Sequence, residues 1–294
     1  MNILTILAEI EKVDPEVSER LDQRRAIFKH FAGFGKKLAA STLPLAMGAM
    51  FHKAYAQSPG LSQQIKDVLN FALGLEYLEA VFYNEGLHKP GLLTGQDNTD
   101  IHTIAVDEDN HVNFLSTVLG RDAIPPMAIG DFDYTGSKGG TRAPLLPDVF
   151  TNRDTFLALA QSFEDTGVRA YKGGAPLLMS NNDILEAALN IHSVEARHAS
   201  HLRTMRRGGA QVVAGSPQTA PKSWVSGNDG GGPAPSVTAA IYGAGQPASA
   251  FPAEENTVQA GITLSSANPT ASEAFDEPLD MASVLAIASN FSAR

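Results

Sequence analysis

Two glutamate-histidine pairs with the same internal spacing carry the clearest chemical signal in this sequence. Glu108 and His111 form one Glu-x-x-His pair, and Glu195 and His198 form the other. Residues three apart share one face of a helix, so each carboxylate would lie beside its histidine. A single pair of this kind is common by chance and is usually a solvated pair or a capping interaction. Two matched pairs instead indicate a site for metal ions, because carboxylate oxygens and imidazole nitrogens together suit iron or manganese.

A further glutamate precedes each pair at a matched distance. Glu76 lies 32 residues before the first pair (76 to 108), and Glu164 lies 31 residues before the second (164 to 195). Tyr83 and Tyr171 each follow one of these glutamates by seven residues. This recurrence predicts a degenerate repeat of one helical hairpin.

The predicted metal centre combines the two halves of this repeat. In each Glu-x-x-His pair the glutamate can bridge two ions while the histidine binds one of them. With the two preceding glutamates as terminal ligands, the set would hold two ions, and the residue types do not separate iron from manganese. The predicted ligands are Glu76, Glu108, His111, Glu164, Glu195 and His198.

Four residues near these ligands are candidates for a supporting role around the centre. Glu79, one turn after Glu76, is either an extra ligand or the true ligand, and the repeat favours Glu76. Tyr83 and Tyr171 either hydrogen-bond to the ligand carboxylates or serve only as aromatic core residues, and we favour the core. His192 is either a hydrogen-bond donor to the centre or a satisfied core histidine, and we again favour the core.

Four amphipathic segments are expected to position these side chains as helices. Each has an apolar stripe of three- and four-residue steps that includes one of the four glutamates. Asp97 or Asn98 is the expected cap of the second helix, and Gly167 in the third leaves space for a small ligand or a neighbouring helix. Ionised carboxylates in a core are costly to desolvate, so four buried together require cations, protons or both. The segments cover about 61–86, 97–119, 151–174 and 182–207.

The connections between these segments indicate a four-helix bundle. About ten residues join the helices of each pair, which is short enough for an antiparallel hairpin. The proline-containing segment 121–150 is too long to join neighbours and is expected to cross between the hairpins. Two antiparallel hairpins joined by a long crossover are the connectivity of the ferritin-like bundle, so the predicted fold class is all-α.

The chain after the bundle has a different composition. Residues 208–236 are dominated by Gly, Pro, Ser, Ala and Thr, which predicts an irregular, poorly packed extension over 208–294. Within it, Asp280 is expected to cap a short helix through Ala288. The apolar residues expected to pack from this end of the chain are Val284, Leu285, Ile287 and Phe291. Short extended pieces are expected at 237–242 and 258–264.

The first 56 residues have the features of an export signal. Arg24 and Arg25 begin a stretch that resembles the twin-arginine motif, an apolar stretch follows over 38–51, and Ala54-Tyr55-Ala56 provides a small-residue cleavage site. The alternative is an ordinary basic helix of the folded protein. We expect export to the periplasm or the exterior, which leaves residues 57–207 as the bundle domain.

Charge and composition restrict the partners. The chain has 22 basic and 32 acidic residues and a formal charge of −10, which argues against a nucleic-acid partner. It has no cysteine, which excludes disulfides and thiolate metal clusters. No apolar run reaches the 18 residues that a membrane-spanning helix requires, so we expect no permanent membrane span.

The stretch 75–83, Leu-Glu-Tyr-Leu-Glu-Ala-Val-Phe-Tyr, together with the two Glu-x-x-His pairs, resembles the ferritin-like superfamily. More closely, it is similar to bacterial ferritin-like domain proteins related to plant desiccation-related proteins, as is the tail segment 273–279. The resemblance implies that Glu76 and Glu164 are terminal ligands and that Glu108 and Glu195 bridge.

The resemblance and the predicted centre together define an expected function. We expect an exported protein whose two iron or manganese ions react with oxygen or peroxide, by ferrous-iron oxidation or peroxide removal, in stress protection. A manganese catalase-like enzyme and a non-catalytic desiccation or stress scaffold are the alternatives. The expected partner is a small-molecule oxidant, and the bundle is also compatible with a homo-oligomer. The long extension argues against the compact subunit of a mineral-storing shell.

Overall fold

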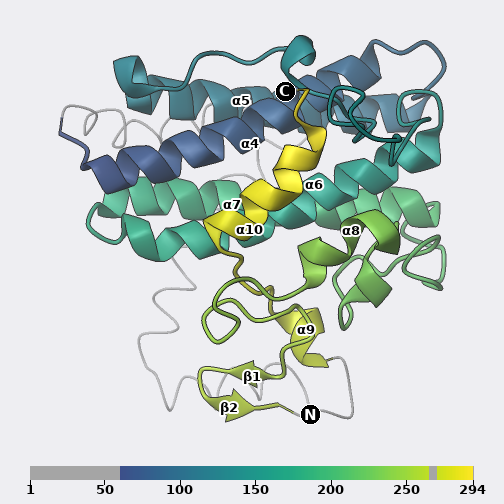
Figure 1. Ribbon diagram of the computed structural model, residues 1–294. Helices are drawn as coiled ribbons and strands as arrows, with labels where there is room; N and C mark the ends of the chain where they lie inside the picture. The colour runs from purple at the N-terminus through teal and green to yellow at the C-terminus, as the bar shows by residue number, and fades with distance from the viewer. Residues whose placement is uncertain (1–59, 265–269, 294) are drawn as a thin grey trace, which may run out of the picture. The chain divides into compact units, whose positions relative to one another are not determined.

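The computed structural model describes residues 60–264 and 270–293. The predicted export signal over 1–56 lies outside these residues. The described part contains four long helices that lie side by side in Figure 1. They are α4 (Gln63–Leu87), α5 (Gln96–Leu119), α6 (Arg153–Gly174) and α7 (Asn182–Arg207). All four predicted helices are therefore confirmed, with ends within about one turn of those expected.

The helices pair as the connection lengths predict. α4 packs along α5, α6 packs along α7, and the two hairpins meet through contacts of α4 with α6 and of α5 with α7. The fold is therefore the expected all-α, ferritin-like bundle. Within residues 60–264 and 270–293, no helix has both the length and the hydropathy needed to cross a membrane.

Local sequence signals set most of the helix ends. The side chains of Ser62, Asn152 and Asn181 accept hydrogen bonds from first-turn main-chain N–H groups of α4, α6 and α7. The expected Asp97 or Asn98 cap of α5 is wrong, because α5 begins after Gly95, which has a φ of 56° and no side chain. Asp97 lies in the first turn and is instead bound by Arg153, with 2.5 Å between Oδ2 and Nε.

The crossover between α5 and α6 packs its later part into the core of the bundle. It contains two short 3-10 helices, η1 (Gly120–Asp122) and η2 (Ile129–Asp131). Tyr134 inserts its ring into the core, and its hydroxyl donates to the main-chain carbonyl of Leu78 at 2.8 Å. Its ring contacts those of Phe82, Phe150 and Phe163, and Phe156 stacks on Phe82. This part of the core is thus packed with aromatic side chains.

The extension has regular structure of its own. Its elements are η4 (Asp229–Gly231), α8 (Pro235–Tyr242), β1 (Val258–Gln259), β2 (Ile262–Thr263), α9 (Thr270–Ala274), α10 (Met281–Ala288) and η5 (Ser289–Phe291). A further 3-10 helix, η3 (Ala175–Leu178), joins α6 to α7. β1 and β2 form a small antiparallel hairpin, which confirms the extended piece expected at 258–264.

Two details of the extension differ from expectation. The segment 237–242 is helical rather than extended, because Pro235 occupies the first turn of α8 and favours a helix start. The helix after Asp280 is confirmed, since its carboxylate accepts from the N–H of Ser283 at 3.0 Å. However, Leu285 is 52% exposed, because Val284 and Ile287 form the buried face of α10.

The extension is largely irregular, as predicted, but it is not poorly packed. Figure 1 shows α10 lying against α6, and residues of the bundle and the extension share one apolar cluster. The cluster comprises Leu75, Ala170, Val225, Ile241, Tyr242, Leu279, Val284 and Ile287. Large apolar residues are less frequent in this part of the chain than in the bundle, and buried arginines of the bundle supply further contacts.

Arg169 of α6 is the centre of these polar contacts. Its guanidinium is buried and donates to main-chain carbonyls of Gly243, Pro252 and Glu277 at 2.9–3.0 Å. It also contacts the carboxyl group of Glu254 at 2.9 Å. An irregular segment leaves many carbonyls without helical partners, and a buried arginine can satisfy several of them at once. Main-chain acceptors therefore replace much of the apolar packing that the composition lacks.

Candidate metal centre

The structure brings all six predicted ligands together in the middle of the bundle. Glu76 comes from α4, the first Glu-x-x-His pair from α5, Glu164 from α6 and the second pair from α7. All six side chains are buried. They form two groups in which one ligand atom per residue lies within 4.8 Å of the others: Glu76, Glu108, His111 and Glu195; and Glu108, Glu164, Glu195 and His198. Glu108 and Glu195 belong to both groups.

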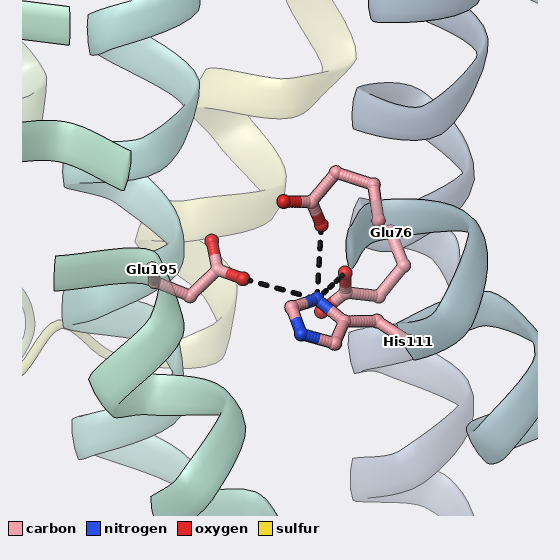
Figure 2. Close-up of side chains that lie close together, drawn as sticks. Glu76, His111 and Glu195 are labelled. Carbon is pink, nitrogen blue, oxygen red and sulfur yellow. Dashed lines mark hydrogen bonds and ion pairs between the residues drawn. The ribbon is translucent and has the colours of Figure 1, made fainter. Parts of the chain in front are cut away.

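The imidazole of His111 faces three carboxylates. Its Nδ1 lies 3.0 Å from Glu76 Oε2, 3.0 Å from Glu108 Oε2 and 3.4 Å from Glu195 Oε1. Figure 2 shows the Glu76 and Glu195 carboxylates approaching this nitrogen from different helices. A single N–H cannot satisfy three carboxylates, whereas a cation can be bound by all of these groups.

The imidazole of His198 has a similar inner side and a different outer side. Its Nδ1 lies 2.8 Å from Glu108 Oε1 and 3.2 Å from Glu164 Oε2. Its Nε2 lies 3.2 Å from Asp107 Oδ2, a carboxylate that the sequence analysis did not single out. Such an outer partner fixes the tautomer and orientation of a ligating histidine.

The two halves of the repeat differ at this outer position. Asp107 immediately precedes Glu108, and the matching residue before Glu195 is Val194. The Nε2 of His111 is buried and has no hydrogen-bond partner within the residues that the structure describes. The sequence carried a signal for this asymmetry, because an acid and a valine occupy equivalent places in the repeat.

The two tyrosines of the repeat contact ligand carboxylates, so the favoured role as purely core residues is wrong. Tyr83 of α4 donates its hydroxyl to Glu164 Oε1 at 2.5 Å, and Tyr171 of α6 donates to Glu76 Oε1. Each tyrosine therefore binds the glutamate of the opposite hairpin. Sequence spacing could not show this exchange, because it depends on how α4 packs against α6.

Glu79 and His192 have different positions relative to the centre. Glu79 is buried but belongs to neither group of candidate ligands. Burial raises its pKa well above the usual range, and the carboxylates of Glu195 and Glu164 raise it further. His192 is half-buried, and its Nδ1 lies 3.0 Å from the carbonyl of Val168. This bond to the main chain fits the favoured interpretation, a satisfied histidine, rather than the alternative of a donor to the centre.

Gly167 makes room for one of the shared carboxylates. A Cβ atom at this position would lie 2.5 Å from Glu195 Oε2. The space expected beside Gly167 is therefore taken by the side chain of Glu195, not by an additional ligand.

The buried carboxylates of the cluster require positive charge or protons to balance them. Burial raises the pKa of Glu76 to about 7, with a partial offset from His111. Burial also raises the pKa of Glu195 well above its usual range, and neighbouring carboxylates add to this. Burial opposes ionisation of Glu108 too, but His111 and His198 outweigh it and lower the pKa of this carboxyl. Without cations, the cluster must retain protons.

Several oxygens of the cluster are suited to metal binding. Glu108 Oε1 and both carboxylate oxygens of Glu195 are buried without a hydrogen-bond partner in the described residues. Glu108 Oε1 does lie near His198 Nδ1, but not in hydrogen-bonding geometry. Buried polar atoms are normally paired, so unpaired oxygens shared by two ligand groups fit bound ions. The donor set of carboxylates and two imidazoles fits iron or manganese.

Comparison with known proteins agrees with the fold. Residues 65–207 match the family model described as Ferritin-like domain. No curated protein and no solved structure matched the chain. The matched segment begins inside α4, includes the rest of the four bundle helices and contains all six predicted ligands, so this part of the chain is similar to a ferritin-like domain. The relation to plant desiccation-related proteins stays a prediction.

Proposed function

We propose that the ferritin-like domain binds two iron or manganese ions and reacts with oxygen or peroxide. The observation that carries this proposal is the pair of buried ligand groups that share Glu108 and Glu195. Two shared carboxylates between two histidine-containing groups are the arrangement expected for a dinuclear centre in a four-helix bundle.

The residues divide into two sets of terminal ligands and one shared set. Glu76 and His111 would hold one ion, and Glu164 and His198 would hold the other, with both ions sharing the two bridging carboxylates. Bound iron or manganese would supply the electron transfer that oxidation by oxygen or removal of peroxide requires. The hydroxyls of Tyr83 and Tyr171 orient the terminal carboxylates, and the buried setting excludes bulk water.

We propose ferrous-iron oxidation or peroxide removal as the reaction, in the context of stress protection. A manganese catalase-like enzyme would use the same ligands. The measurement that separates them is metal content by elemental mass spectrometry after anaerobic loading, followed by oxygen and peroxide consumption on the same sample. About two ions per chain with turnover supports a redox enzyme, and the metal that gives turnover identifies the reaction.

A variant makes the test specific to the centre. Glu108→Gln should lose metal and turnover together, because it alters a carboxylate common to both groups. Glu85→Gln is the matched control, since Glu85 pairs with Lys89 on the surface of the same bundle. Stress protection that survives complete loss of metal would instead support the non-catalytic scaffold.

We also propose that the chain is exported. The support is the Arg24-Arg25 motif, the apolar stretch after it and the small-residue site ending at Ala56. Cell fractionation and N-terminal sequencing test this directly: a periplasmic or secreted chain beginning at Gln57 is expected. A cytoplasmic chain that retains its first residues would refute export without affecting the metal centre.

A further inference from the structure

An apolar cavity lies beside the metal centre. Its volume is about 20 Å³, and its walls come from all four bundle helices. The lining includes Ala72, Leu115, Tyr171, Ala188 and Ile191. A cavity needs roughly 10–15 Å³ to hold one water-sized molecule, so this one has room for a small molecule such as a diatomic gas.

The cavity adjoins one of the two ligand groups. Leu115 lies one helical turn after His111, and Ile191 lies one turn before Glu195. Ala72 is likewise one turn before Glu76. These three ligands all belong to the group that contains His111. The cavity is therefore at the His111 end of the centre.

Tyr171 connects the cavity to the centre by direct contact. Its ring lines the cavity, and its hydroxyl donates to Glu76. The lining contains no charged side chain, and Tyr171 supplies its only side-chain hydroxyl. A polar molecule would consequently lose its hydrogen bonds to water when it enters the cavity.

The repeat shows that this cavity is a specific feature of one end of the bundle. The residues that match Ala72, Leu115 and Ile191 in the other half of the repeat are Ala160, Leu202 and Ile104. These counterparts lie in the core cluster that Phe82, Tyr134, Phe156 and Phe163 fill. Aromatic rings, one of them from the crossover, thus occupy the end that corresponds by symmetry to the cavity.

We propose that this cavity binds dioxygen and delivers it to the His111 side of the centre. Dioxygen is apolar, diatomic and free of hydrogen-bond donors, so it matches the cavity in size and in chemistry. Hydrogen peroxide has two O–H donors and would be left unpaired there. The inference rests on the proposed function for its catalytic meaning, and it favours oxygen over peroxide as the oxidant at this end.

The binding site is tested on metal-free protein, because paramagnetic iron or manganese would itself change the relaxation of nearby nuclei. Dissolved dioxygen is paramagnetic and broadens methyl resonances that it contacts. Under oxygen pressure, the methyl groups of Leu115 and Ile191 should relax several-fold faster than those of Leu202 and Ile104. All four residues are buried, so burial alone predicts no difference between them. Equal relaxation of the two pairs would overturn the proposal.

Filling the cavity supplies the second arm of the test. Ala188→Leu places a larger side chain in the lining and should remove the extra relaxation. Ala187→Leu is the matched control, because Ala187 is also buried on α7 but does not line the cavity. If Ala188→Leu does not fold, Ala72→Val is the milder substitution. Unchanged relaxation in a folded lining variant would overturn the proposal.

The link to catalysis is measured separately. In metal-loaded protein, Ala188→Leu should slow oxygen consumption several-fold at unchanged metal content, and Ala187→Leu should not. An unchanged rate in Ala188→Leu would refute delivery through the cavity. If the unaltered protein binds no metal, the proposed function fails. The relaxation experiment still decides whether dioxygen occupies the cavity.

Discussion

Asp107 provides a direct test of the proposed dinuclear centre, because it contacts His198 and not His111. Asp107 Oδ2 lies 3.2 Å from Nε2 of His198, whereas the Nε2 of His111 has no hydrogen-bond partner in the described residues. Replacement by Asn removes the charge and preserves the size of the side chain. We expect Asp107→Asn to weaken metal binding at the His198 group and to leave the His111 group unchanged.

The size of the effect follows from the geometry. Loss of an outer partner of a ligating histidine typically lowers metal affinity by 10–100-fold. The Asp107 side chain is 35% exposed, and the 3.2 Å contact is at the long end of the hydrogen-bond range. Both features place the expected loss near the lower limit, at about tenfold or about 1.4 kcal/mol.

The assay is an anaerobic titration with manganese, measured by calorimetry. It is carried out in two variants, each of which disables one of the two ligand groups. Glu76→Gln leaves the His198 group intact, and Glu164→Gln leaves the His111 group intact. Asp107→Asn should weaken binding in the first background only. Asp100→Asn is the charge-matched control, because Asp100 pairs with the surface residue His201. Equal weakening in both backgrounds, or no weakening in either, would refute the assignment of Asp107.

Three further predictions concern the surroundings of the centre. Tyr171→Phe should weaken metal binding about tenfold in the same titration, because it removes the donor that orients a terminal carboxylate. Gly173→Ala would place Cβ 2.0 Å from the Leu279 carbonyl oxygen. It should lower the free energy that holds the extension against the bundle by about 1–3 kcal/mol, and limited proteolysis should then cut the extension faster. Gly174→Ala, with Cβ in ordinary contact, should have neither effect. Burial raises the pKa of Glu254 to about 8, outweighing the opposing effect of the nearby guanidinium. The folded state therefore holds this proton more tightly than the unfolded state. Its contribution to stability is complete at acid pH and is lost as pH rises toward about 8. Melting curves should show a flatter pH dependence for Glu254→Gln, and identical slopes would contradict the assignment.

The bundle and its six candidate ligands were predictable because both depend on local patterns. Helix periodicity places residues three and four apart on one face, and the repeat then identified which glutamates share that face. The same logic found the helix after Asp280, since a capping acid before an apolar segment is a local signal. Such signals need no knowledge of how distant segments pack.

The features that were missed all depend on contacts between distant segments. Tyr83 and Tyr171 reach across to the opposite hairpin, which their spacing within one hairpin does not reveal. The packing of the extension depends on Arg169, a residue of α6 that binds main-chain carbonyls along the later chain. Main-chain acceptors leave no mark in side-chain composition, so a composition rich in glycine and proline predicts poor packing even where the segment is well packed.

The departures from the repeat matter more for function than the repeat itself. An ideal duplication of one hairpin would give two equivalent ligand groups with equivalent surroundings. Here the His198 group has the partly exposed Asp107 at its outer side, and aromatic rings fill the core at that end of the bundle. The His111 group has a valine at the matching position and an apolar cavity at its end. A polar partner favours tight metal binding on one side, and an apolar space favours access of a gas on the other. The two ions of the proposed centre should therefore differ in affinity and in exposure to oxidant, although their ligand types are the same.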